Sequence, residues 1–326
     1  MKESRRNNMS KPIIAVYAIT KDWQLEEIKA TAKDYDVRVK DEIRPEDIKN
    51  IEIVYGWGSE LSENIADLKQ LKWIQKDTAG VDAIPESLRK DKDIFLSNMS
   101  GVHAVPITEN IFGYILGVAR GIIPAMTNQL ESKWDKSIAS NMFSLNDKKV
   151  LVYGTGSIGQ EIARTAKFFE MATYGVNSNG RSIQTFDHSY TMESSQDILS
   201  DMDFVINALP LTDESELFFD KEIFANMKDT AYFLNIGRGE SVKDEHLIEE
   251  LEAGTLAGAY LDVTSPEPLP ESSKLWQTQN LVITPHISGN VEHFRDTIYP
   301  IFKENLDSYL SYGTLAKNEY NKKKGY

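Results

Sequence analysis

The sequence contains no cysteine at all. Its 326 residues therefore form no disulfide, offer no thiolate nucleophile and supply no cysteine ligand to zinc or to an iron–sulfur cluster. A chain without cysteine fits a reducing compartment, and we expect a cytoplasmic protein with no metal site.

Long hydrophobic runs are also missing. No apolar stretch approaches the roughly 18 residues that cross a membrane, so we expect a soluble protein without a membrane partner. The opening MKESRRNNMS is polar and has no apolar segment behind its basic residues, which excludes a secretory signal on this pattern. We interpret it as a loose leader, with Met9 as an alternative start.

Basic residues are fewer than acidic residues in this sequence. Lys and Arg number 36 against 50 Asp and Glu, which gives a formal net charge of −14. A surface this acidic repels nucleic acid, and we expect no nucleic-acid partner. Any site for an anionic ligand must gather positive groups locally, so single arginines beside a glycine-rich loop carry more information than usual.

Short apolar runs alternate with segments of helical spacing along the whole chain. This alternation is typical of parallel sheets covered by helices on both faces. In the first part, the predicted strands are 13–18, 36–39, 51–55, 73–76 and 94–97, with helical spacing at 23–32 and 64–71. In the second part, they are 150–153, 173–176, 204–207, 232–235, 257–262 and 281–283, with helices at 158–169 and 244–253. The pattern predicts two doubly wound α/β units.

A long apolar stretch, 107–130, separates the two units, and we expect Pro124 to break or kink it. A final helical segment, 294–309, has no strand of its own to cover, which indicates that the chain returns to the first unit. We therefore predict a discontinuous domain of residues 1–105 and 291–326, and an inserted domain of residues 106–290.

The first strand of the second unit runs straight into a glycine-rich loop, Gly154-Thr-Gly-Ser-Ile-Gly159, and then into an amphipathic helix. In this context Gly154 permits the tight turn, Gly156 lets the backbone approach a pyrophosphate, and Gly159 lets helix and strand pack closely. The N–H groups of Ser157 and Ile158 would face the phosphates. The alternative is a glycine turn that merely joins strand to helix.

The next strand ends without the acidic residue that usually binds the ribose hydroxyls of NAD. Asn177 and Ser178 stand there instead, with Arg181 close behind. An amide, a hydroxyl and a guanidinium accept a 2′-phosphate, which a carboxylate would repel, so the sequence favours NADP over NAD. The alternative is that Arg181 is a solvated loop charge and that NAD binds without the acidic contact.

Three polar residues follow later strands, each beside glycine or proline: Arg238, Glu267 and His286. Arginine matches a carboxylate with two parallel hydrogen bonds. Histidine both gives and takes a proton near neutrality, and a carboxylate on its other nitrogen stabilises the imidazolium. This combination suits the reduction of a 2-oxo acid. Taken singly, each residue has a structural alternative: a buried histidine, a solvated arginine or a loop-capping glutamate.

The order of five motifs resembles the D-isomer-specific 2-hydroxyacid dehydrogenase family. The motifs are GTGSIG from 154, NALPLT from 207, NIGRGE from 235, LDVTSPEPLP from 261 and TPHISG from 284. The resemblance covers most of the chain and is most specific from Lys148 to Gly289. It implies a Rossmann dinucleotide-binding domain inserted into a flavodoxin-like substrate domain, with a cleft between them, and a homodimer.

The resemblance also assigns roles. Arg238, Glu267 and His286 match the family's catalytic residues, and Asp262 matches the acid that holds the nicotinamide carboxamide. Further cofactor contacts are implied for Thr108, Leu209, Pro210, Ile236 and Gly237. The main chain at Ala79, Gly80 and Val81 would grip the substrate carboxylate beside Arg238. Thr108 and Asn110 replace the family's more usual Ala and His, and Tyr55, Trp57 and Tyr299 are weaker candidates for the pocket wall.

The function expected from these observations is hydride transfer between NAD(P)H and a small 2-oxo acid, such as glyoxylate, hydroxypyruvate or pyruvate, giving a D-2-hydroxy acid. Two alternatives remain open. One is a cofactor-sensing binding protein with the same fold, and the other is a related dehydrogenase that acts on phosphite or formate.

Overall fold

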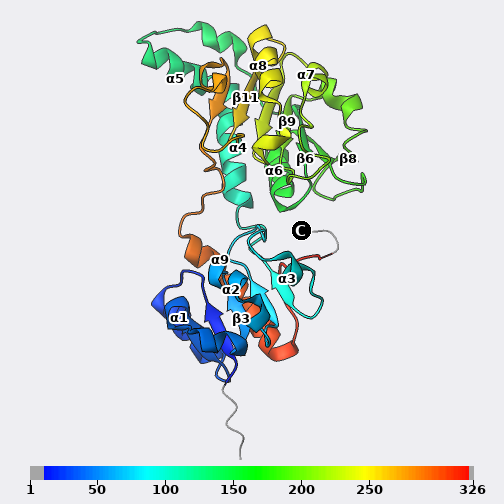
Figure 1. Cartoon of the computed structure of the whole chain (residues 1–326). Helices are drawn as coiled ribbons and strands as arrows, with labels where there is room; N and C mark the ends of the chain where they lie inside the picture. Colours follow the sequence, from blue (N-terminus) through cyan, green and yellow to red (C-terminus); the bar gives the residue numbers. More distant parts are fainter. Residues whose placement is uncertain (1–10, 323–326) are drawn as a thin grey trace, which may run out of the picture. The chain divides into compact units, whose positions relative to one another are not determined.

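The structure is a computed structural model that describes residues 11–322. The expected leader, including Met9, lies outside the described residues. The described chain divides into two compact units (Figure 1). Unit 1 contains residues 11–102 and 291–322, and unit 2 contains residues 103–290. The chain thus leaves unit 1, builds unit 2 and comes back. The boundary expected from sequence, between residues 105 and 106, falls inside the first helix of unit 2.

Unit 2 is built on a seven-stranded parallel sheet with the order β12-β11-β10-β9-β6-β7-β8. The strands are β6 (Lys149–Tyr153), β7 (Ala172–Val176), β8 (His188–Tyr190), β9 (Phe204–Asn207), β10 (Tyr232–Asn235), β11 (Gly258–Leu261) and β12 (Leu281–Ile283). The order reverses between β6 and β9, which is the position where doubly wound sheets bind ligands. The three-residue edge strand β8 is the only strand of this sheet that the sequence pattern did not predict.

Helices cover both faces of this sheet because strand residues alternate between two cores. Val150 and Val152 pack under α4 and α6, whereas Leu151 and Tyr153 pack under α7 and α8. The helices of unit 2 are α4 (Ala104–Ala119), α5 (Ile122–Leu130), α6 (Ser157–Phe168), α7 (Lys221–Ala225) and α8 (Asp244–Ala253), with short 3₁₀ turns η4 (Ser137–Asn141), η5 (Gln196–Asp201), η6 (Gly239–Ser241) and η7 (Lys274–Gln277).

The long apolar stretch breaks at Gly121, and the expectation that Pro124 breaks it is wrong. Helix α4 ends at Ala119, and Gly121 adopts a left-handed conformation with φ of 68° before α5 begins. Pro124 is the third residue of α5. A proline is tolerated in the first turn, because the N–H that it lacks has no intrahelical partner there.

Unit 1 has a five-stranded parallel sheet with the order β2-β1-β3-β4-β5. Its strands are β1 (Ile13–Val16), β2 (Asp36–Val39), β3 (Ile51–Tyr55), β4 (Trp73–Gln75) and β5 (Phe95–Ser97). Its helices are α1 (Asp22–Thr31), α2 (Ser59–Glu63), α3 (Glu86–Lys90) and α9 (Phe294–Tyr312), with 3₁₀ turns η1 (Lys40–Glu42), η2 (Pro45–Asn50) and η3 (Ile65–Asp67). The C-terminal helix α9 closes one face of this sheet, since the Phe302 ring stacks on Tyr55 with centroids 3.9 Å apart. The expectation of a helix at 64–71 is wrong: α2 ends before this range, and within it only the 3₁₀ turn η3 forms.

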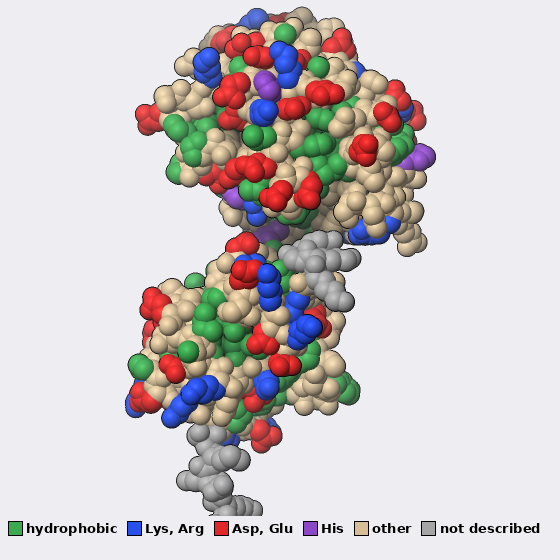
Figure 2. Space-filling model, turned by 45° about the vertical axis from the view of Figure 1, so that its right-hand side comes forward, with side chains coloured by type: hydrophobic (Ala, Val, Ile, Leu, Met, Phe, Trp, Pro, Cys, Tyr) green, Lys and Arg blue, Asp and Glu red, His purple; other side chains and the backbone are tan. Residues whose placement is uncertain are grey.

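The surface agrees with the acidic composition. On the face drawn in Figure 2, acidic and basic side chains are interspersed over each unit without a broad basic patch. No helix in the described part of the chain is both long and apolar enough to pass through a membrane. The described residues also contain no cluster of three or more His, Asp or Glu side chains suited to holding a metal ion.

Candidate active site

The carboxyl edge of the unit 2 sheet brings the three predicted catalytic residues together in sequence order. Arg238 follows β10, Glu267 lies in the loop after β11, and His286 follows β12. These three strands are neighbours in the sheet. Parallel strands all end at the same edge, so residues far apart in sequence meet there.

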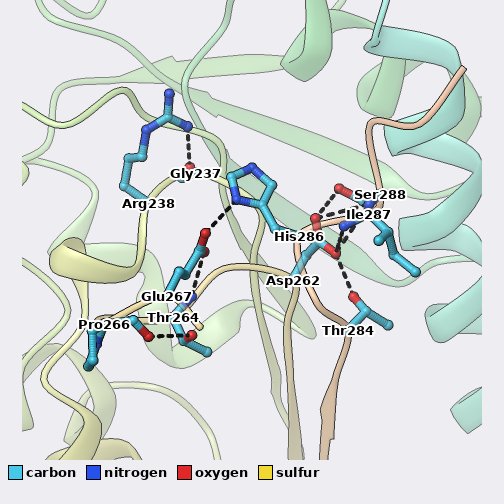
Figure 3. A network of polar contacts seen from close by, with 10 residues as sticks. All are labelled: Gly237, Arg238, Asp262, Thr264, Pro266, Glu267, Thr284, His286, Ile287 and Ser288. Carbon is cyan, nitrogen blue, oxygen red and sulfur yellow. Dashed lines mark hydrogen bonds and ion pairs between the residues drawn. The ribbon is translucent and has the colours of Figure 1, made fainter. Parts of the chain in front are cut away.

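His286 and Glu267 form the central contact of the site. The Nδ1 atom of His286 lies 2.8 Å from a carboxylate oxygen of Glu267. A carboxylate only accepts hydrogen bonds, so Nδ1 carries the proton and Nε2 is left to exchange one. The other Glu267 oxygen accepts the backbone N–H of Thr264 at 3.2 Å, which holds the carboxylate in place. Figure 3 shows the imidazole with one nitrogen turned to Glu267 and the other turned away from it.

Both side chains remain accessible to small molecules. The side chain of His286 is 53% exposed and that of Glu267 is 39% exposed. The expectation of an imidazole paired with Glu267 at a strand end is therefore matched by the geometry. The structural alternative of a buried core histidine does not fit an imidazole that is half exposed.

Arg238 is exposed beside this pair, and its guanidinium donates to the carbonyl oxygen of Gly237 at 2.7 Å. Among the described residues no carboxylate pairs with it, so its remaining N–H groups are free to bind an anion. The carbonyl oxygen of Arg238 accepts hydrogen bonds from the side chains of Asn235 and Ser241. The turn that presents the guanidinium is therefore fixed by hydrogen bonds from two buried residues.

A buried polar network under Arg238 was not predicted. Asn207 donates to Asn235 at 2.9 Å and to Ser241 at 2.7 Å, and these three residues are at most 1% exposed. Asn207 and Asn235 are paired in register at the ends of β9 and β10. Two asparagines at matching strand ends are the signal that could have revealed the network from the sequence.

Asp262 anchors the loop that carries His286. Its side chain is buried, at 2% exposure, and its carboxylate accepts the backbone N–H groups of Ile287 and Ser288 and the hydroxyls of Thr284 and Ser288. Figure 3 shows these bonds converging on the carboxylate. The expected contact of Asp262 with a nicotinamide carboxamide stays a prediction beside this structural role.

The glycine-rich loop after β6 has three glycines in three different situations. Gly154 has φ of 103°, and a β-carbon there would lie 2.8 Å from the carbonyl oxygen of Ala208. A β-carbon on Gly159 would lie 1.9 Å from the Gly154 oxygen. Gly156 is exposed, and a β-carbon there would meet nothing within 4 Å. Gly154 and Gly159 are thus needed by the fold, whereas Gly156 opens onto free space.

This open space lies at the start of α6, whose first residues are Ser157 and Ile158. The first N–H groups of a helix have no intrahelical partner and attract anions. A close approach of backbone to a dinucleotide pyrophosphate is therefore possible at Gly156. The loop geometry fits the cofactor role predicted from the sequence.

The loop after β7 carries the residues expected to select the cofactor. Asn177 is buried, and its side chain is used within the loop: it donates to the Arg181 carbonyl and accepts the Arg181 N–H. Arg181 is exposed, and its guanidinium donates only to the neutral side chain of Asn179, at 3.3 Å. No carboxylate within the described residues neutralises it, and the exposed hydroxyl of Ser178 lies in the same loop.

The remaining cofactor candidates come from α4 and from the segments that follow β9 and β10. Thr108 of α4 is 3% exposed, and its hydroxyl oxygen has no hydrogen-bond partner in the described protein. Leu209 and Pro210 follow β9, and a β-carbon on Gly237 would lie 2.6 Å from the Leu209 oxygen. Ile236, between β10 and Gly237, is buried.

The candidate substrate loop belongs to unit 1, where it follows β4. Asn98 donates to the Ala79 carbonyl at 2.8 Å, and Thr78 donates to the Gly80 carbonyl at 2.9 Å. These bonds use the loop carbonyls rather than the N–H groups of Gly80 and Val81. The joint binding of a substrate carboxylate by these N–H groups and Arg238 stays a prediction.

Two of the weaker pocket candidates are core residues of unit 1. Tyr55 is 1% exposed and Tyr299 is 3% exposed, and the Tyr299 hydroxyl bonds Glu27 at 2.8 Å. Trp57 is partly buried and donates to Ser62 at 2.9 Å.

The fold and this site together define a dinucleotide-binding α/β protein that presents an imidazole–carboxylate pair and a free guanidinium at one edge of its sheet. Comparison with known proteins leads to the same class. The family model described as D-isomer specific 2-hydroxyacid dehydrogenase, NAD binding domain, matches residues 112–288.

Individual relatives extend the match over most of the chain. A human glyoxylate reductase/hydroxypyruvate reductase is 30% identical over 72% of this chain and 73% of its own length. A hydroxypyruvate reductase from Thermotoga maritima is 30% identical over 72% of this chain and 78% of its own. A solved family protein from Aeromonas salmonicida is 28% identical, covers 96% of this chain and 100% of its own, and has a TM-score of 0.75. The chain belongs to the D-isomer specific 2-hydroxyacid dehydrogenase family, and it is an oxidoreductase of that class.

Proposed function

We propose that this protein reduces a small 2-oxo acid to the D-2-hydroxy acid, reversibly, with NADPH rather than NADH as the preferred cofactor, and that His286 and Arg238 act on the acid. The observation that carries the proposal is the 2.8 Å contact between His286 Nδ1 and Glu267. It leaves Nε2, on the side away from Glu267, as the atom that exchanges a proton with the substrate oxygen.

Protonated His286 donates from Nε2 to the carbonyl oxygen while the carbonyl carbon receives a hydride, so one C–H bond and one O–H bond form. A nicotinamide cofactor bound to unit 2 would supply that hydride. Glu267 stabilises the imidazolium before the transfer and keeps the ring in the required orientation afterwards. In the reverse direction neutral His286 takes the hydroxyl proton back at the same atom.

Arg238 would bind the substrate carboxylate. Its guanidinium is exposed and unpaired with any acid in the described chain, and its turn is braced by Asn235 and Ser241. Two parallel N–H bonds to a carboxylate fix a small acid in one orientation. We expect the main chain at Ala79, Gly80 and Val81 to contribute to the same carboxylate.

Three features of unit 2 support a dinucleotide cofactor. Gly156 leaves open space at the start of α6, Thr108 carries a buried hydroxyl without a partner, and Arg181 is an exposed cation after β7. The N–H groups of Ser157 and Ile158 would hold the pyrophosphate. Ser178 and Arg181 would hold a 2′-phosphate, since no acidic side chain stands between Asn177 and Arg181 to repel it.

The human relative is named for glyoxylate and hydroxypyruvate reduction and the Thermotoga maritima relative for hydroxypyruvate reduction, so these acids are the first to test. The experiment follows the absorbance of NADPH and of NADH with glyoxylate, hydroxypyruvate, pyruvate and 2-ketogluconate. Formate and phosphite, with the oxidised cofactors, complete the panel. Oxidation of NADPH by at least one oxo acid supports the proposal. Cofactor binding without turnover would instead favour a cofactor-sensing binding protein, and turnover only with formate or phosphite would favour the third candidate.

The proposal includes a homodimer formed through α5. No residue of α5 is buried, although Ile122, Met126 and Leu130 recur at a spacing of four and are 53%, 60% and 89% exposed. Trp134, just beyond, is 91% exposed. Residues four apart share one helix face, and an apolar face of this kind is commonly covered by a second protein surface. We propose that a second copy of the chain covers it.

A further inference from the structure

Four side chains from three segments of unit 2 form a series of polar contacts behind the His286 loop. The Tyr260 hydroxyl of β11 contacts the side-chain amide of Asn110 on α4 and lies 2.6 Å from Thr284 Oγ1, and it has a single proton for these two neighbours. Thr284 in turn donates to the carboxylate of Asp262 at 2.5 Å. Tyr260 and Asp262 are each 2% exposed, so helix α4 is tied to the loop through buried groups.

The 284–288 loop, which these contacts reach, has a backbone conformation that its surroundings must stabilise. His286 has a left-handed backbone conformation with φ of 54°, which residues other than glycine keep only when their surroundings enforce it. Its N–H donates to the Asp262 main-chain oxygen at 2.8 Å, while the Asp262 carboxylate collects the N–H groups of Ile287 and Ser288. Asp262 therefore grips the loop at His286 and at the two residues after it.

The geometry points to Tyr260 and Asn110 as positioning residues for His286. Acting through Thr284 and Asp262, they hold the 284–288 loop in the conformation that turns the imidazole towards Glu267. Neither residue reaches the reacting atoms. The kinetic consequences of this inference rest on the proposed function, whereas the orientation of the imidazole can be measured without it.

The chemistry of Tyr260 suits this role. Burial raises the pKa of its hydroxyl to about 12, so the phenol keeps its proton at neutral pH. Its ring stacks on Tyr114 of α4, with centroids 5.3 Å apart. Replacing Tyr260 by Phe therefore keeps the ring packing and removes only the contacts with Asn110 and Thr284.

Tyr114 provides the matched control. It is a buried tyrosine in the same layer, and its hydroxyl has no part in this hydrogen-bond chain. The experiment compares Tyr260→Phe with Tyr114→Phe in the full-length protein with ¹⁵N-labelled histidine. With five histidines in the chain, the His286 imidazole signals are assigned by their loss in His286→Ala. We expect Tyr260→Phe to shift these signals and Tyr114→Phe to leave them in place.

The kinetic arm uses an oxo acid that the unaltered enzyme reduces. Tyr260→Phe should lower kcat about tenfold, because small displacements of a reacting group are costly, while the cofactor Kd changes less than about twofold. Thr284→Ser retains the hydroxyl and should keep most of the activity, whereas Thr284→Val should behave like Tyr260→Phe. The kcat of the Tyr260→Phe/Thr284→Val double variant should fall no further than that of the worse single variant, because both substitutions interrupt the same series of contacts.

Unchanged His286 signals in Tyr260→Phe, or equal shifts in both tyrosine variants, would overturn the inference whatever the activity. Additive kinetic losses would also overturn it. If the unaltered protein reduces no oxo acid, the proposed function fails, and the imidazole signals still decide whether Tyr260 positions His286.

Discussion

The carbonyl oxygen of Gly154 lies so close to the α-carbon of Gly159 that a β-carbon on residue 159 would stand 1.9 Å from it. Three residues from Gly159, at Gly156, a β-carbon would meet nothing within 4 Å. The two glycines of one loop therefore serve different purposes. One lets helix α6 pack on β6, and the other keeps space free in front of the helix.

This contrast predicts opposite outcomes for two alanine variants. Gly159→Ala should lower the free energy of unfolding by about 2–3 kcal/mol, because backbone must shift to relieve the overlap. Gly156→Ala should leave the melting temperature nearly unchanged but weaken NADPH binding, because the new methyl group occupies the space proposed for the pyrophosphate. Thermal melts and fluorescence titration with NADPH measure both. Unchanged NADPH affinity in Gly156→Ala would count against the proposed phosphate site.

Arg181 should decide the choice between the two cofactors. Arg181→Ser removes the exposed guanidinium after β7, and we expect the Kd for NADPH to rise roughly tenfold or more while the Kd for NADH hardly changes. Lys221→Ala is the control for the loss of one surface charge. This lysine pairs with Glu249 on the face of the sheet that α7 and α8 cover, away from the loop that contains Arg181. Equal weakening of both cofactors by Arg181→Ser would contradict the proposed 2′-phosphate contact.

The exposed apolar face of α5 should hold a dimer together. Met126→Glu and Leu130→Glu would each bury an unpaired carboxylate in the proposed interface, so we expect either variant to convert dimer to monomer. Phe168→Glu is the control, because Phe168 is 81% exposed but lies at the end of α6. Light scattering coupled to size exclusion gives the masses. A monomeric unaltered protein, or dimers in both α5 variants, would rule the interface out.

Asp244 should make stability depend on pH. Burial, with a smaller contribution from Glu245, raises the pKa of Asp244 from 3.8 to about 6. Between about pH 4 and pH 6 the folded protein holds a proton that the unfolded chain has released, so this residue lowers stability as pH rises through that window. Asp244→Asn should therefore melt at a higher temperature than the unaltered protein at pH 8, with the difference shrinking towards pH 4. The exposed Asp213→Asn variant should show no such trend, and a constant difference for Asp244→Asn would contradict the prediction.

Much of the fold follows from apolar runs of four to six residues, because buried parallel strands are apolar on both faces. Strand β8 escaped prediction because it is three residues long, partly polar and at the sheet edge. The break before α5 was misplaced because a left-handed glycine ends a helix more effectively than a proline that fits its first turn.

Some features of the candidate site could also be predicted from the sequence, whereas others could not. Arg238, Glu267 and His286 were predictable because each lies in a loop that follows a strand, and parallel strands end at one edge. The contact of Tyr260 with Asn110 could not be predicted, because the two residues are 150 positions apart and no local sequence pattern marks them as partners. The use of the Asn177 side chain within its own loop also depends on a backbone turn that composition alone does not specify.

The proton-donating role of His286 is the claim on which the account depends. The most direct test is the kcat of oxo-acid-dependent NADPH oxidation by His286→Ala, measured together with the Kd for NADPH. We predict that kcat falls by about 10²–10⁴-fold, as expected for loss of a general acid, while the Kd stays within about twofold. A kcat close to that of the unaltered enzyme, or a parallel loss of cofactor binding, would contradict the account.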